Sequence, residues 1–134
     1  MKAPALVAVD QEPRAFAPLF AAAKGRGVRI GWLDLRSEVE PPPELAAVEG
    51  AAKAVSARAG RTIVVKPTKG TPVLRDLLRE HFVGYAIVLV SGHDGRPRLS
   101  VDSEGARLEL AADRSRRFSL DELLAELLRP RHRA

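Results

Sequence analysis

Two short runs of apolar and β-branched residues constrain the fold of this chain more than any other feature. Ala3 to Asp10 has the sequence APALVAVD, and Tyr85 to Val90 has the sequence YAIVLV. Runs this short and this continuous are typical of strands buried on both faces of a parallel sheet. Val28 to Leu35 and Arg61 to Lys66 are further predicted strands. Parallel strands need crossover connections, so helices are expected between them.

Three segments between these strands show helical signals. The first begins at Glu12-Pro13 and stops at Gly25, with Pro18 either kinking it or marking a later first turn. The second is predicted over 43–59, with proline at its first position, because its apolar residues are spaced three and four apart and Gly60 follows in the usual C-terminal place. The third begins at Thr71-Pro72, an N-cap followed by proline at the first helical position, and closes near Gly84.

The pattern changes after Val90. Turn dipeptides flank Arg98 to Asp102 and Arg107 to Leu110, where apolar and polar residues alternate, which predicts an antiparallel meander with one solvated face. Ser119 and Glu122 form an S-x-x-E capping box, and a stripe of leucines follows it up to Pro130. The chain is therefore expected to end with an amphipathic capping helix.

The predicted fold class is α/β: a mixed sheet of about six strands, built from βαβαβα crossovers and then a meander, with helices on both faces. At 134 residues the chain has the size of one domain, so residues 1–134 are predicted to form a single domain. Residues 129–134 are predicted to be a flexible basic tail.

Composition narrows the function classes. The chain has no cysteine, which excludes a disulfide framework and any thiolate zinc site and fits a reducing compartment. No apolar run is long enough to cross a bilayer, so no membrane association is expected and the cytoplasm is the predicted location. The formal net charge of +5 would attract polyanions.

The most specific candidate site is the loop before the third helix. Loops at the carboxyl ends of parallel strands line ligand crevices, and a helix N-terminus there offers free backbone N–H groups to an anion. Arg75 and Arg79 are four residues apart and so share a face of the following helix. The candidate ligand-binding residues are Lys66, Lys69, Gly70, Thr71, Arg75 and Arg79. The segment is not a Walker loop, and an ordinary capped surface loop is the alternative interpretation.

Other basic groups have a simpler interpretation. Arg114, Arg116 and Arg117 precede the last helix, and further arginines occur in the tail; both groups are interpreted as solvated charges or as complements of a helix dipole. The histidines lack the spacing of a metal site.

Three functions remain open. The leading hypothesis is a non-catalytic module that binds a phosphate-bearing ligand, a nucleotide or a nucleic-acid backbone, with steep salt dependence and little sequence preference. The second is a protein-interaction or self-assembly domain that uses the leucine-rich last helix or an exposed sheet edge. The third is an enzyme acting on phosphate esters, in which Asp10 and Asp34 hold Mg²⁺ if their strands are adjacent. Only this third hypothesis involves a cofactor.

Overall fold

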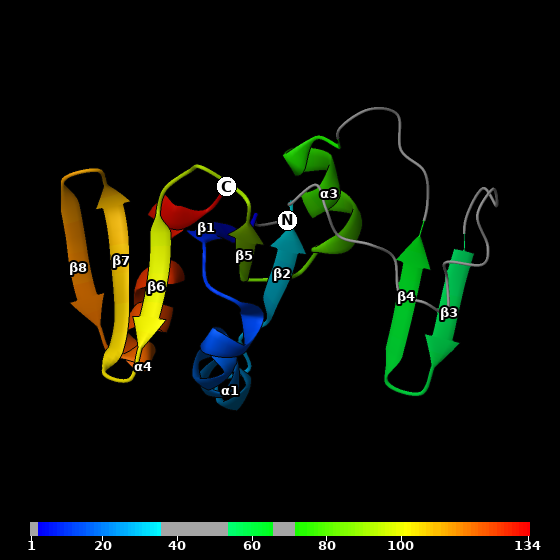
Figure 1. The fold of residues 1–134 in the computed structure, drawn as a ribbon, viewed down its shortest axis with the longest axis horizontal. Helices are drawn as coiled ribbons and strands as arrows, with labels where there is room; N and C mark the ends of the chain where they lie inside the picture. The colour runs from blue at the N-terminus through cyan, green and yellow to red at the C-terminus, as the bar shows by residue number, and fades with distance from the viewer. Residues whose placement is uncertain (1–2, 36–53, 66–71) are drawn as a thin grey trace. The chain divides into compact units, whose positions relative to one another are not determined.

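The structure is a computed structural model that describes residues 3–35, 54–65 and 72–134. Its main feature is a six-stranded mixed sheet with strand order β2-β5-β1-β6-β7-β8 (Figure 1). The strands of this sheet are β1 (Ala5–Val9), β2 (Ile30–Asp34), β5 (Ile87–Ser91), β6 (Arg98–Asp102), β7 (Gly105–Ala111) and β8 (Arg114–Phe118). The predicted α/β class with a mixed sheet of six strands is confirmed.

The parallel half consists of β2, β5 and β1, which β6 joins as a fourth parallel strand. All five residues of β5 are buried, as expected for a strand with neighbours on both sides and cover on both faces. After β1 the chain forms a 3-10 turn, η1 (Pro13–Phe16), and helix α1 (Ala17–Gly25). Pro18 lies at the start of α1, so it marks a later first turn instead of a kink.

The antiparallel half is the predicted meander, and it ends in helix α4 (Leu120–Leu127) and a 3-10 turn, η2 (Pro130–His132). The capping box is present: the hydroxyl of Ser119 accepts from the backbone N–H of Glu122, whose carboxylate accepts from the backbone N–H of Ser119. Helices α1 and α4 contact each other on one face of the sheet. Between them and the strands lies a core that contains Val7, Leu89 and Leu108.

Aromatic side chains cover both faces of the parallel strands. On the α1 side, the rings of Phe16 and Trp32 lie 5.7 Å apart. On the other side the ring of Phe82, which follows helix α3 (Leu74–His81), packs over Gly31. A Cβ atom at Gly31 would lie 2.5 Å from that ring, so only glycine fits without a shift.

The helix predicted over 43–59 is wrong for the part of it that the structure describes. Residues 54–58 form strand β3 (Ala54–Arg58), which pairs antiparallel with β4 (Arg61–Val65) in a separate two-stranded sheet. Gly60 has a φ of +85° in the turn between them. A glycine in this conformation can end a helix or close a hairpin, and the sequence signal does not distinguish the two. The strand predicted from Arg61 is therefore present, but its expected place in the main sheet is wrong.

Strand β8 takes the sixth position in the main sheet, although Arg114 to Phe118 carries no strand signal of the kind seen in the other strands. It forms one of the two edges of this sheet, opposite β2.

The described residues form two compact units, 3–35 with 78–134 and 54–65 with 72–77, and the prediction of one domain stays a prediction. Within the first unit, residues 129–134 include η2. Arg133 forms a β-bridge with Ala5, and the backbone N–H of Ala134 donates to the carbonyl of Pro4 at 2.8 Å. Over the described part of the chain, no helix has the length and apolar character that a membrane span requires.

Candidate anion-binding site

The predicted ligand-binding loop falls largely outside the described residues. Lys66, Lys69, Gly70 and Thr71 all lie there, so their role stays a prediction. Arg75 and Arg79 are on α3, exposed and four residues apart, as predicted. Their part in ligand binding also stays a prediction.

The two candidate catalytic carboxylates are not on adjacent strands. β5 lies between β1 and β2, and the register aligns Val9, Ser91 and Asp34 across the three strands. Asp10 follows Val9, so its backbone is about two strand spacings, or roughly 10 Å, from that of Asp34. Among the described residues, no cluster of three His, Asp or Glu side chains could hold a metal. The adjacency that the magnesium hypothesis required is therefore missing, and the catalytic roles remain untested.

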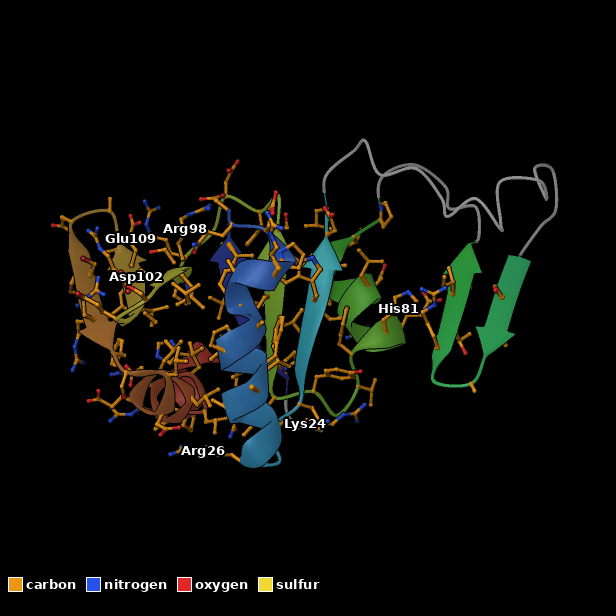
Figure 2. The ribbon with its side chains drawn as sticks, turned by 60° about the horizontal axis from the view of Figure 1, so that its bottom comes forward. Lys24, Arg26, His81, Arg98, Asp102 and Glu109 are labelled. Atoms are coloured by element: carbon orange, nitrogen blue, oxygen red, sulfur yellow. The ribbon has the colours of Figure 1, made fainter. Side chains whose placement is uncertain are left out.

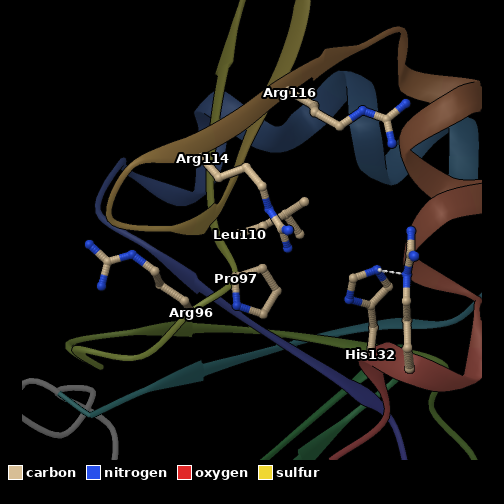
Figure 3. A pocket seen from close by; sticks show the side chains of 7 residues that line it. Arg96, Pro97, Leu110, Arg114, Arg116 and His132 are labelled. Atoms are coloured by element: carbon tan, nitrogen blue, oxygen red, sulfur yellow. Dashed lines mark hydrogen bonds between the residues drawn. The ribbon is translucent and has the colours of Figure 1, made fainter.

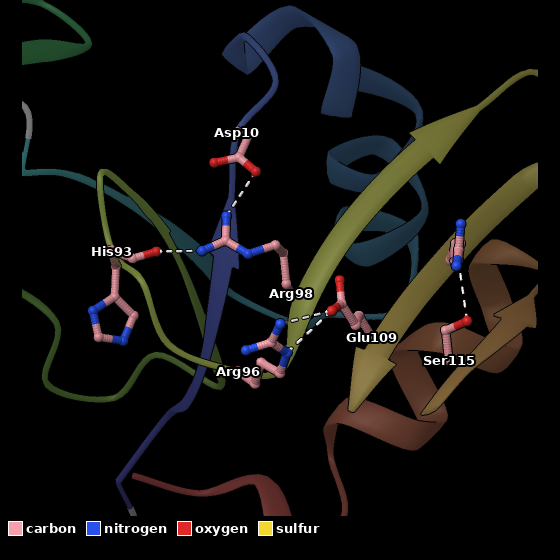
Figure 4. A network of polar contacts seen from close by, with 7 residues as sticks. Asp10, His93, Arg96, Arg98, Glu109 and Ser115 are labelled. Atoms are coloured by element: carbon pink, nitrogen blue, oxygen red, sulfur yellow. Dashed lines mark hydrogen bonds and ion pairs between the residues drawn. The ribbon is translucent and has the colours of Figure 1, made fainter. Parts of the chain in front are cut away.

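Asp10 instead takes part in a polar network at the carboxyl end of β1 (Figure 4). The guanidinium of Arg98 donates to a carboxylate oxygen of Asp10 at 2.7 Å and to the backbone carbonyl of His93 at 2.7 Å. Beside it, the side-chain amide of Gln11 donates to the carbonyl of Val101 and accepts from its N–H, at 2.9 and 2.7 Å. These contacts hold the segment after β1 against β6, which is a structural role.

The face of β6–β8 that turns away from α4, here called the outer face, carries arginines opposite acids (Figure 2). Arg117 pairs with Asp102 at 2.8 Å, and Arg96, just before β6, pairs with Glu109 at 2.8 Å. The hydrogen bond from Arg117 holds the pKa of Asp102 below its usual range, and that carboxylate in turn raises the pKa of Arg117. Arg107, on the same face, donates to the hydroxyl of Ser115.

Arg114 and Arg116 lie on the opposite face of β8, here called the helix-side face, because side chains alternate along a strand. Arg116 is the cross-strand partner of Leu108 on β7. These two arginines line a pocket of about 410 Å³ that we call the arginine pocket. Its lining residues are Arg96, Pro97, Leu110, Arg114, Arg116, Arg131 and His132. Figure 3 shows Arg114 extending toward Leu110, with His132 across the pocket, whereas Arg96 points away from both.

Charge in this pocket is only partly neutralised. Arg96 is paired with Glu109, and Arg131 is paired with Glu126. Within the described part of the chain, neither Arg114 nor Arg116 forms an ion pair with a carboxylate. Arg116 lies over the ring of Phe118, 5.0 Å from its centre. The pKa of Glu122 is lowered mainly by its hydrogen bonds with Ser119, and the charge of Arg116 lowers it slightly further.

One wall of the pocket is held by a buried carboxylate. The side chain of Glu126 is 4% exposed; it accepts a hydrogen bond from Arg131, pairs with Arg129 at 3.0 Å and lies 3.4 Å from Nε2 of His132. Burial alone would raise the pKa of Glu126, but the hydrogen bonds from Arg131 and His132 and the charge of Arg129 bring it below its ordinary value. Glu126 therefore stays ionised and fixes η2 beside β7 and β8.

The pocket itself is not among the sites predicted from the sequence. Arg114 and Arg116 are interpreted there as solvated charges, because the segment that carries them is not recognised as a strand. A period-two pattern in R-S-R-R-F would place Arg114 and Arg116 on one face with Phe118. No sequence pattern predicts that Arg131 and His132 of η2 line the pocket, because their place depends on contacts between segments distant in the sequence.

The leucine-rich helix of the protein-interaction hypothesis is packed into its own core. Leu123, Leu124 and Leu127 are each at most 1% exposed, whereas Leu128, just past the helix, is 40% exposed. The leucine stripe is therefore already covered, which leaves the sheet edges of this hypothesis, and β8 is one of them.

Comparisons with known proteins bear on the fold. No protein-family model and no curated protein matches this sequence. The structure is similar to a crystal structure of Bacillus subtilis MobB, with a TM-score of 0.50 and 17% identity over 74% of this chain and 68% of that one. A second structure of Bacillus subtilis MobB has a TM-score of 0.49 and 16% identity, over 75% of this chain and 66% of that one. At this level of identity, the likeness supports the α/β fold alone.

Proposed function

We propose that this chain is a binding module for a phosphate-bearing ligand and that the arginine pocket receives the phosphate. The observation that carries the proposal is the pair Arg114 and Arg116, two guanidinium groups that share one pocket and have no ion-pair partner among the described residues. The planar fork of a guanidinium matches phosphate oxygens in a two-point hydrogen bond, which makes arginine well suited to this ligand.

The surroundings of the pair favour a ligand over water alone. Arg116 is oriented by the ring of Phe118 beneath it, so less side-chain entropy is lost when it binds an anion. Arg131 and His132 form a wall held by Glu126, and the pocket volume lies within the usual range for small-molecule sites. An anion placed here would neutralise charge that no ion pair in the described part of the protein neutralises.

The direct test is to titrate the isotope-labelled full chain with inorganic pyrophosphate and follow backbone and guanidinium signals by NMR. We expect shifts centred on Leu110, Arg114, Arg116 and His132, and an affinity that falls steeply with added salt. The double substitution Arg114→Ala with Arg116→Ala should abolish these shifts.

A matched control separates the pocket from net charge. Replacing Arg107 and Arg117 by alanine also removes two positive charges from the β7–β8 pair, but it removes them from the outer face. This control should retain pyrophosphate binding, with at most a modest loss from the weaker overall field. Equal losses in the two double variants would refute the pocket and leave only nonspecific attraction of polyanions.

The edge strand β8 favours a second candidate function, protein interaction or self-assembly by strand addition. One side of β8 pairs with β7, and no strand of the described residues lies on its other side. Replacing Ser115 by proline would block pairing at that edge, and the association state can be followed by analytical ultracentrifugation. A monomeric wild-type chain at all concentrations would remove the self-assembly form of this candidate.

A further inference from the structure

We infer that the arginine pocket selects a dianionic phosphate monoester carried by a small molecule, over the phosphodiester backbone of a nucleic acid. This inference rests on the proposed function and narrows its ligand class. It follows from three features of the described residues: the charge left in the pocket, its apolar floor, and the absence of a free aromatic platform.

The charge left in the pocket matches a dianion. Of the four arginines that line it, Arg96 and Arg131 already have carboxylate partners, so Arg114 and Arg116 supply the charge open to a ligand. A phosphate monoester carries about −1.5 to −2 charges at pH 7, whereas each phosphate of a diester carries about −1. A monoester therefore carries, in one phosphate, the charge that would neutralise both guanidinium groups.

The floor of the pocket suits an apolar or planar group next to that phosphate. Pro97 and Leu110 line it, and both are only partly buried, so they keep apolar surface available for contact. Figure 3 shows Arg114 beside Leu110, which places the cation and the apolar surface within reach of one small ligand. Covering that surface adds a favourable term that a free phosphate ion lacks.

A nucleic-acid backbone fits the same residues less well. Binding of single strands without sequence preference combines a groove of cations along the backbone with aromatic rings on which bases stack. The aromatic ring beside the free arginines, that of Phe118, is already covered by Arg116. On the outer face, two of the three arginines of these strands, Arg98 and Arg117, are engaged by carboxylates, and the third, Arg107, donates to Ser115, so most of the positive charge of that face is already neutralised.

The experiment compares two probes that differ by one methyl group and one charge. Phenyl phosphate and methyl phenyl phosphate are titrated into the full-length wild-type chain by calorimetry at pH 8 and low salt. Adenosine 5′-monophosphate, a phosphoserine-containing peptide and a short oligothymidylate are titrated in parallel. The Arg114→Ala/Arg116→Ala variant and the Arg107→Ala/Arg117→Ala control are measured with each probe.

We expect phenyl phosphate to bind at least about tenfold more tightly than methyl phenyl phosphate, because it presents a second charge to the two arginines. The preference should disappear in the Arg114→Ala/Arg116→Ala variant and persist in the control. Equal affinities for the two probes, or tighter binding of the oligothymidylate than of phenyl phosphate, would overturn the monoester inference and leave the phosphate-binding proposal intact. Tighter binding of the phosphopeptide than of the nucleotide would overturn the small-molecule assignment. Failure of every probe to bind would overturn the proposed function itself.

Discussion

The two faces of strands β6–β8 use arginine in opposite ways. On the outer face Arg98 lies 2.7 Å from the carboxylate of Asp10 and Arg117 lies 2.8 Å from that of Asp102, whereas Arg107 donates to the hydroxyl of Ser115. On the helix-side face of the same strands, Arg114 and Arg116 have no ion-pair partner among the described residues and line a pocket. The net charge of +5 therefore does not show where an anion could bind, since the pairing of arginines with acids differs between the two faces.

The difference has a physical cause in the alternation of a strand. Side chains at positions i and i+2 share a face, so the sequence R-S-R-R-F sends Arg114 and Arg116 toward the helices and Arg117 toward Asp102. The cross-strand partner of Arg116 is Leu108, which is apolar and offers no charge to it. A cation at the rim of such a face remains available for a ligand.

The largest expected effect comes from breaking the core that packs against the helix-side face. Leu108 is fully buried under α4, so Leu108→Ala should lower the free energy of unfolding by about 2–5 kcal/mol through lost burial and the cavity left behind. Chemical denaturation monitored by circular dichroism measures it. The exposed Leu128→Ala serves as the control and should change stability by less than about 1 kcal/mol. A similar small effect at both positions would mean that α4 does not pack on β7 as described.

The next largest effect on stability is expected at Glu126, the buried carboxylate on the helix side of the sheet. Glu126→Gln should destabilise the chain by about 1–2 kcal/mol near pH 7, because Arg131 and His132 lose their charged acceptor. The pKa of Glu126 lies below its ordinary value of 4.5 in the folded chain, so its contribution is complete above that value and is lost as the pH falls through the lower, folded-state pKa.

Stability curves of wild type and Glu126→Gln at neutral and acidic pH test this directly. The two proteins should differ near pH 7 and converge in acid. Asp102→Asn, on the outer face, is the comparison variant: the pKa of Asp102 is also lowered, but its pair with Arg117 is half exposed, so its loss should leave stability nearly unchanged. A difference for Glu126→Gln that does not depend on pH would contradict an ionic role for this carboxylate.

The parts of the fold that could be predicted are those fixed by local signals. The capping box at Ser119 sets the start of α4, and alternation of Leu99 and Val101 sets β6, with boundaries that the structure reproduces. The buried runs set β1 and β5 in the same way. In each case the information lies within a few residues of the element that it specifies.

The parts that could not be predicted depend on pairing between segments. Ala54 to Arg58 has an alanine-rich, helix-compatible sequence, and it is a strand because Val64 and its neighbours pair with it. β8 is polar at four of its five positions and is a strand because it pairs with β7. The arginine pocket depends on local alternation, which sets the face of each arginine, and on strand pairing, which decides whether a carboxylate lies opposite it.

The smallest expected effect comes from giving the outer face an arginine without an ion-pair partner, as in the arginine pocket. Asp102→Asn frees Arg117 from its partner without removing any arginine. We expect oligothymidylate to bind this variant slightly more tightly than wild type at low salt, because one more cation of the outer face becomes available, and the gain should shrink at physiological salt. Phenyl phosphate affinity for the arginine pocket should change less. If the freed outer face gained nothing, pairing with acids would not be what distinguishes the two faces, and the shape of the pocket would have to account for anion binding alone.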